Sequence, residues 1–199
     1  GEGKKMNKVL YIILISIFSL IVFSCSDKEE SSSSSGPYWQ LIAKQADSDV
    51  QLFSSNARST FLENENDDSS STFMSIGNLD KSNYADLDEK YKFKQVWGGK
   101  TVDSSGITKE VTWTQTSWLT DSAITGFQEI GTSGHATVGN SLKGLGKSDS
   151  SNCVIDGNGG SANWWHCAGA IGKHKGGIPG PQNKIASSMY LYIWSPSNL

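Results

Sequence analysis

The feature that most constrains the fold of this chain is a stretch near residues 152–172 that combines two cysteines with two adjacent tryptophans. Cys153 and Cys167 flank a segment rich in glycine and asparagine that ends in Trp164 and Trp165. Large aromatic side chains are costly to leave in water, and a fixed loop is needed to hold them. We therefore predict a surface loop that is closed by a disulfide and has an aromatic floor. The bridge would stabilise the fold by about 3 kcal/mol in the chain-entropy description.

A catalytic role is the alternative interpretation of these cysteines. A thiol nucleophile needs a free cysteine that is paired with a histidine. His166 adjoins Cys167, but neighbouring side chains in a sequence usually point apart. The residues therefore favour a structural bridge over a reactive thiol.

The N-terminal segment has the pattern of an export signal. Lys8 precedes an apolar run at residues 9–23, which is too short for an ordinary membrane span. The run ends in Val22-Phe23-Ser24-Cys25, which resembles the bacterial lipobox. We predict a signal peptide at residues 1–24, with extra residues before Met6, and lipidation of Cys25; a simple signal anchor is the alternative.

The following segment, residues 25–36, consists of a cysteine, charged residues and a run of serines. Such a composition cannot bury apolar surface, so we expect a disordered tether. A lipidated cysteine followed at once by acidic residues also resembles the surface-export signal of Bacteroidetes lipoproteins. We therefore expect a protein at the outer membrane or cell surface that touches the membrane through its lipid anchor only. Export is also compatible with a disulfide.

The charge of the chain excludes one class of partner. Its formal net charge is −3, and removal of the lysine-bearing signal segment makes the remainder more acidic still. Nucleic acid requires a basic footprint for its phosphates. We expect no nucleic-acid partner.

Residues 37–199 are predicted to form a single globular domain of the α+β class, mainly antiparallel β-sheet with few short helices and long loops; the lectin-like character of this domain is implied only by the resemblance described next. The 21 glycines and seven tryptophans favour short strands and many turns. Residues 91–97 alternate between side chains of two kinds, as a half-buried strand does. Further strands are predicted at 38–44, 50–53, 110–118, 124–130 and 185–194, a short apolar segment at 73–79, one helix at 82–89 and a long loop at 131–151.

Two segments of this domain resemble fibrinogen-related domains such as those of ficolins and tachylectins. Asn152-Cys153-Val154 and Ala162-Asn163-Trp164-Trp165-His166-Cys167 are similar to the end of those domains, where two cysteines are bridged across a Trp-Trp motif. The opening, from Tyr38 to Phe53, resembles the family's first strands, and residues 184–194 lie where the family has its last strand. Intelectins are a more distant comparison. The resemblance implies a fibrinogen C-terminal-like fold with a pocket for acetylated sugars beside the disulfide.

The chain departs from this family at its calcium loop. The family carries several aspartates just before the first cysteine, whereas residues 147–151 offer only Asp149. Calcium binds six to eight oxygen atoms, so we expect no cofactor, with Asp149 as the one candidate ligand for Ca²⁺. The segment Asp156-Gly157-Asn158-Gly159-Gly160 lacks the remaining ligands of a calcium loop and is predicted to be a turn.

The residues near the disulfide also predict a ligand site on their own chemistry. Trp164 and Trp165 offer flat apolar faces to sugar C–H groups or an acetyl methyl. Hydrogen bonds to hydroxyl groups would come from Asp156, Asn158, Asn163 and His166. The alternative is that one or both tryptophans belong to the core.

The favoured function is therefore a lipid-anchored surface protein that binds a glycan or glycoconjugate. The second hypothesis is a structural or adhesion lipoprotein that binds a protein partner in the cell envelope. A third, an envelope hydrolase, would need two positioned carboxylates. Because the acidic pairs Asp67-Asp68 and Asp88-Glu89 lie in polar stretches and are expected to be solvated, we do not expect an enzyme.

Overall fold

The computed structural model describes residues 36–46, 52–55, 58–98, 109–133, 142–147, 152–157, 166–173, 176–181 and 184–196. All of them belong to one compact unit, Ser35–Leu199. The predicted signal peptide, Cys25 and the tether up to residue 35 lie outside the described residues. No helix within the described ranges has the length and apolar character needed to cross a membrane.

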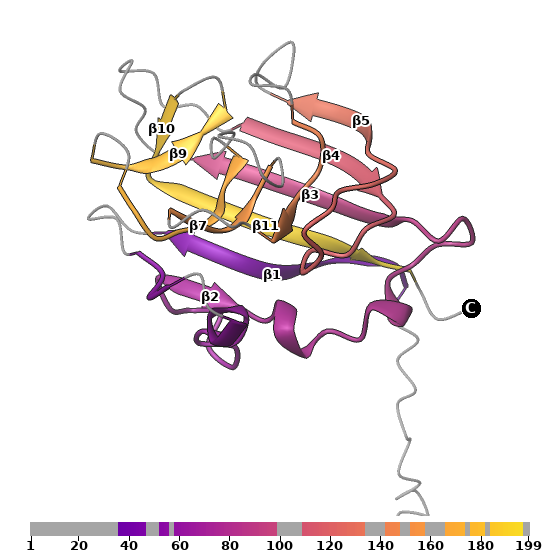
Figure 1. Cartoon of the computed structure of the whole chain (residues 1–199), viewed down its shortest axis with the longest axis horizontal. Helices are drawn as coiled ribbons and strands as arrows, with labels where there is room; N and C mark the ends of the chain where they lie inside the picture. Colours follow the sequence, from indigo (N-terminus) through magenta and orange to yellow (C-terminus); the bar gives the residue numbers. More distant parts are fainter. Residues whose placement is uncertain are drawn as a thin grey trace, which may run out of the picture. The chain divides into compact units, whose positions relative to one another are not determined.

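Six antiparallel strands form the main sheet, in the order β2-β1-β11-β3-β4-β5 (Figure 1). The last strand lies in the middle of the sheet, between β1 and β3, so the two ends of the domain are joined by direct pairing. The bounds are Tyr38–Ala46 for β1, Thr72–Met74 for β2, Tyr91–Gly98 for β3, Lys109–Gln115 for β4, Gln128–Ser133 for β5 and Ser188–Ser195 for β11.

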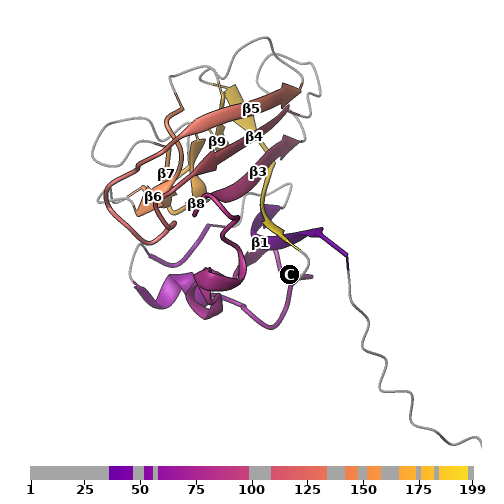
Figure 2. The ribbon, with the colours of Figure 1, turned by 90° about the vertical axis from the view of Figure 1, so that its right-hand side faces the viewer.

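A second layer of short strands packs on one face of the main sheet. Three of them form a small sheet in the order β6-β7-β8, and β9 pairs with β10. Figure 2 shows β6, β7 and β8 together on one side of β3, β4 and β5. Their bounds are Gly146–Lys147, Cys153–Asp156, Ala168–Ala170, Ile178–Gly180 and Lys184–Ala186 for β6 to β10.

The main sheet separates a buried face from a half-buried face, as the alternation in the sequence requires. In β3 the side chains Phe93 and Trp97 are buried, whereas Lys92 and Lys94 are partly exposed. The alternation predicted for residues 91–97 is confirmed. The predicted class is confirmed at the coarse level of a mainly antiparallel β fold, and the longest helix among the described residues, η1, is a 3-10 helix at Arg58–Leu62.

The helix predicted at residues 82–89 is wrong. A single 3-10 turn, η3 (Lys81–Asn83), covers only its start. The Asp86 carboxylate then accepts a hydrogen bond from the Lys90 N–H, and Glu89 has a φ of 58°. A short acidic side chain that bonds to nearby backbone competes with helix hydrogen bonds, and this turn ends the segment.

The predicted strands differ from the observed ones mainly at their ends. The strand predicted at 124–130 begins only at Gln128, because the preceding residues bend around Gly126, whose φ is +66°. The segment predicted at 73–79 is divided between β2 and a second 3-10 turn, η2 (Ile76–Asn78). Residues 52–53 of the strand predicted at 50–53 are described, and they are not in a strand.

A buried glutamine on β4 connects the main sheet to the second layer. The side-chain amide of Gln115 donates to Leu145 O at 2.8 Å and accepts from Leu145 N at 2.9 Å, just before β6. The same oxygen accepts from Trp113 Nε1 at 2.9 Å, and the amide nitrogen donates to Ser117 O at 2.9 Å. Gln115 is fully buried, so its bonds are made away from water.

We predict that Gln115→Leu lowers the free energy of unfolding by about 2–5 kcal/mol, because it leaves the backbone groups of Leu145 and the Trp113 indole N–H buried without these partners. Urea unfolding followed by tryptophan fluorescence measures the change. Gln128→Leu, at an exposed position of β5, is the matched control and should stay within about 0.5 kcal/mol of the wild type. Equal effects of the two substitutions would contradict this role for Gln115.

Candidate functional site

The predicted disulfide is present in the structure. Cys153, at the start of β7, is bonded to Cys167, which directly precedes β8, and their Cα atoms lie 5.9 Å apart. Both residues are fully buried. The bridge links two strands that are already paired, since Ile155 lies opposite Ala168. Both thiols are used in the bridge, so the catalytic-cysteine alternative has no free thiol.

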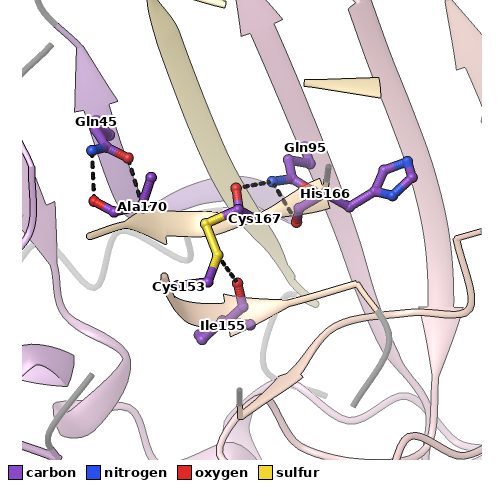
Figure 3. The surroundings of a disulfide bond; sticks show 7 residues. All are labelled: Gln45, Gln95, Cys153, Ile155, His166, Cys167 and Ala170. Carbon is purple, nitrogen blue, oxygen red and sulfur yellow. Dashed lines mark hydrogen bonds between the residues drawn. A yellow bond between two sulfur atoms is a disulfide. The ribbon is translucent and has the colours of Figure 1, made fainter. Parts of the chain in front are cut away.

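Two more glutamines of the main sheet hold the strand that follows the second cysteine (Figure 3). Gln95 on β3 donates from Nε2 to His166 O at 3.3 Å and to Cys167 O at 3.1 Å. Gln45 on β1 donates to Ala170 O at 3.0 Å and accepts from Ala170 N at 2.8 Å. Both side chains are fully buried. The backbone from residue 166 to residue 170 is therefore fixed at both ends.

The small side chains of β8 allow this close approach. Its middle residue, Gly169, has a φ of +90°, a conformation that side chains with a Cβ rarely adopt. A Cβ added there would lie 3.0 Å from Val154 Cγ2 and 3.1 Å from Met74 Cε. The Ala-Gly-Ala sequence of β8 thus permits the backbone to lie within reach of glutamine side chains.

The two ends of the tryptophan-bearing segment meet in the structure. A Cβ added to Gly157 would lie 2.6 Å from His166 Cβ, so the residues on either side of 158–165 are in contact. Four of the predicted ligand residues, Asn158, Asn163, Trp164 and Trp165, fall within 158–165 and lie outside the described residues, as does the candidate calcium ligand Asp149.

The other two predicted ligand residues lie beneath the surface. Asp156 is 3% exposed and His166 is 0% exposed. The His166 ring packs edge-on against Trp97 of β3, with the ring centroids 5.8 Å apart. The structure thus buries both side chains, and it places that of His166 against the main sheet; a ligand-contact role for them stays a prediction.

A pocket of about 330 Å³ opens elsewhere on the domain, near β6. This volume is at the lower end of the range for small-molecule sites. Of the predicted ligand residues that the structure describes, neither Asp156 nor His166 is among the described lining residues, which are Phe61, Leu62, Ile76, Gly77, Leu79, Trp118, Thr120 and Lys147. No local sequence pattern indicates this pocket, because its walls come from segments far apart in the chain.

Within the described ranges, no three His, Cys, Asp or Glu side chains lie close enough together to hold a metal ion.

The predicted solvation of the acidic pairs is confirmed, since Asp67, Asp68, Asp88 and Glu89 are all exposed. Hydrogen bonds from Ser69 are the largest cause that lowers the pKa of the Asp67 carboxyl.

Comparison of the chain with known protein families, with curated proteins and with solved structures finds no match. The resemblance to fibrinogen-related domains therefore rests on the sequence segments that carry it.

We predict that reduction of the Cys153–Cys167 bridge lowers the free energy of unfolding by about 3 kcal/mol, the loop-closure contribution of a loop of this size. Urea unfolding with and without a reducing agent measures the loss, and mass spectrometry verifies that the bridge has opened. The double variant Cys153→Ala/Cys167→Ala is the control, because reductant should not change its stability. Unchanged stability of the fully reduced wild type would contradict a stabilising bridge.

Proposed function

We propose that this chain is a binding protein that recognises glycans or glycoconjugates through its segment 158–165. The observation that carries the proposal is the contact between Gly157 and His166, which brings the two ends of that segment together on a fixed base. The disulfide and Gln95 hold this base. A short variable segment on a rigid scaffold is the usual arrangement of a binding loop.

The composition of the segment supports a sugar ligand. Trp164 and Trp165 supply large rigid apolar faces, and Asn158 and Asn163 supply amide donors and acceptors. Aromatic side chains lose little conformational entropy on binding. We propose that these four residues contact the ligand, and that the buried Asp156 and His166 support them from below.

The proposal extends to fold family and location. We propose a fibrinogen C-terminal-like domain, supported by the Trp-Trp-His-Cys segment and the opening from Tyr38 to Phe53. We also propose display at the outer membrane or cell surface through a lipid on Cys25, supported by the apolar run and the lipobox-like residues before it. We propose that glycan binding needs no cofactor, since residues 147–151 offer only Asp149 as a carboxylate.

We predict that the full chain, purified in mild detergent, binds a subset of glycans on an array, with or without calcium. Trp164→Ala and Trp165→Ala, tested separately, should each weaken binding by at least about tenfold, because each removes a large contact surface. Tyr38→Ala, which removes an exposed aromatic side chain at the start of β1, is the matched control and should bind the same glycans as the wild type.

Two results would contradict this function. One is the absence of binding to any glycan, with or without calcium; capture of a defined envelope protein in its place would favour the adhesion hypothesis. The other is a lower melting temperature of both tryptophan variants with unchanged binding, which would assign Trp164 and Trp165 to the core.

A further inference from the structure

The face of the main sheet that points away from the second layer carries a cluster of aromatic and lysine side chains. We name it the aromatic–lysine face and define it by Trp39, Lys92, Lys94, Tyr192 and Trp194. Strand register assembles it from three strands, since Trp39 lies opposite Trp194 and Tyr192 lies opposite Lys94. An irregularity in β1 between Leu41 and Ala43 sets this register.

The members of this face contact one another closely. The rings of Trp39 and Trp194 meet edge to face, with centroids 5.2 Å apart. Lys94 Nζ lies 4.7 Å from the Trp39 ring centroid and 5.0 Å from that of Tyr192. Lys92 Nζ lies 5.0 Å from the Trp194 centroid and 5.6 Å from that of Trp39. The two ammonium groups are therefore held over a continuous aromatic surface.

The described elements leave this face open. The second layer is on the opposite face of the sheet (Figure 2). The buried glutamine side chains point to that face, since they bond to the backbone of the second layer. All five members are only partly buried. Next to them in the same cross-strand row, Thr112 lies opposite Gly131, where an added Cβ would meet nothing within 4 Å. A flat ligand would have access to the rings.

The charge of this face differs from that of the whole chain. The chain is acidic, with a formal net charge of −3, yet Lys92 and Lys94 stand side by side on neighbouring positions of one strand face. The contacts of both ammonium groups within the described residues are with aromatic rings. Burial raises the pKa of the Tyr192 hydroxyl, and the nearby Glu110 carboxylate raises it further. Glu110 lies opposite Val96 on the same face of the sheet, so the two lysines and this one carboxylate together still carry a net positive charge. Charge complementarity therefore favours an anionic occupant.

We propose that the aromatic–lysine face binds an acidic polysaccharide. Sugar rings lie on Trp39, Tyr192 and Trp194, whose faces accept C–H groups, and Lys92 and Lys94 pair with carboxylates on successive sugars. A lipid surface fits less well, because membrane-interface binding needs apolar side chains that insert among acyl chains, and these rings lie partly buried along the sheet. This site is separate from segment 158–165 and does not depend on glycan binding there.

The test uses the full chain in mild detergent and measures its binding to polygalacturonate by tryptophan fluorescence titration. The matched neutral probe is the same polymer with its carboxylates methyl-esterified. We expect binding to the acid form that weakens with added salt and binding at least about tenfold weaker to the ester.

The variant Lys92→Gln/Lys94→Gln should bind polygalacturonate at least about tenfold more weakly than the wild type. Lys81→Gln/Lys143→Gln removes the same charge from exposed positions elsewhere and should bind as the wild type does. Lys92→Arg/Lys94→Arg should retain binding, which separates a charge effect from a packing effect. Trp39→Ala should weaken binding, whereas Trp164→Ala should not.

Four results would overturn the proposal. The first is no binding of the folded wild type to polygalacturonate. The second is binding that is the same for the acid and the ester, or the same for Lys92→Gln/Lys94→Gln and Lys81→Gln/Lys143→Gln. The third is binding only to vesicles of anionic phospholipid, which would make the face a membrane contact. Loss of binding in Trp164→Ala alone would place the acidic polymer at the other site.

Discussion

Three buried glutamine side chains, one on each of β1, β3 and β4, form hydrogen bonds that connect the main sheet to the second layer. The two layers share no strand pairing in the described residues, so their backbones need another means of contact. Gln45, Gln95 and Gln115 bond to backbone groups at residues 145, 166, 167 and 170. A primary amide has both donors and an acceptor, so one side chain can satisfy both groups of a peptide residue. Unpaired, those groups would be costly to bury.

This constraint explains how a layer of two- to four-residue strands can have a defined position. Strands of that length are marginal alone. Gln45, Gln95, the disulfide and the small residues of β8 act on the same short stretch around Cys167. Gly157 and His166, which flank segment 158–165, are in contact, so under the proposed function the binding segment would start and end at a defined place. Pre-organisation of this kind reduces the entropy lost on binding.

Local patterns in the sequence were sufficient for some features and not for others. The alternation of residues 91–97 predicted β3 and its two faces, because a period of two is a property of one strand. Two cysteines in a chain that is expected to be exported predicted the disulfide. The helix at 82–89 was predicted wrongly, since the Asp86 carboxylate bonds to backbone and forms a turn. Gln95 lies on the buried side of the predicted strand, and a buried amide needs hydrogen-bond partners. Its partners are 71 and 72 residues away in the sequence, so no local pattern identifies them.

The candidate sites also combine residues that a local pattern predicts with residues that only the fold brings together. Tyr192, Trp194, Lys92 and Lys94 alternate visibly along two strands, yet only the register of β1 with β11 brings Trp39 beside them. Likewise, His166 has the chemistry of a ligand contact, and its burial against Trp97 comes from packing between layers that no local pattern encodes.

The most direct test of the central role of the glutamines is native-state hydrogen exchange. The amides of Ala170 and Leu145 donate to the side-chain oxygens of Gln45 and Gln115, so their protection reports on these contacts. We predict that both amides exchange only through global unfolding, with the same free energy of opening as the amides of β11 in the centre of the main sheet. Rapid exchange of both through a small local opening, with β11 still protected, would contradict it.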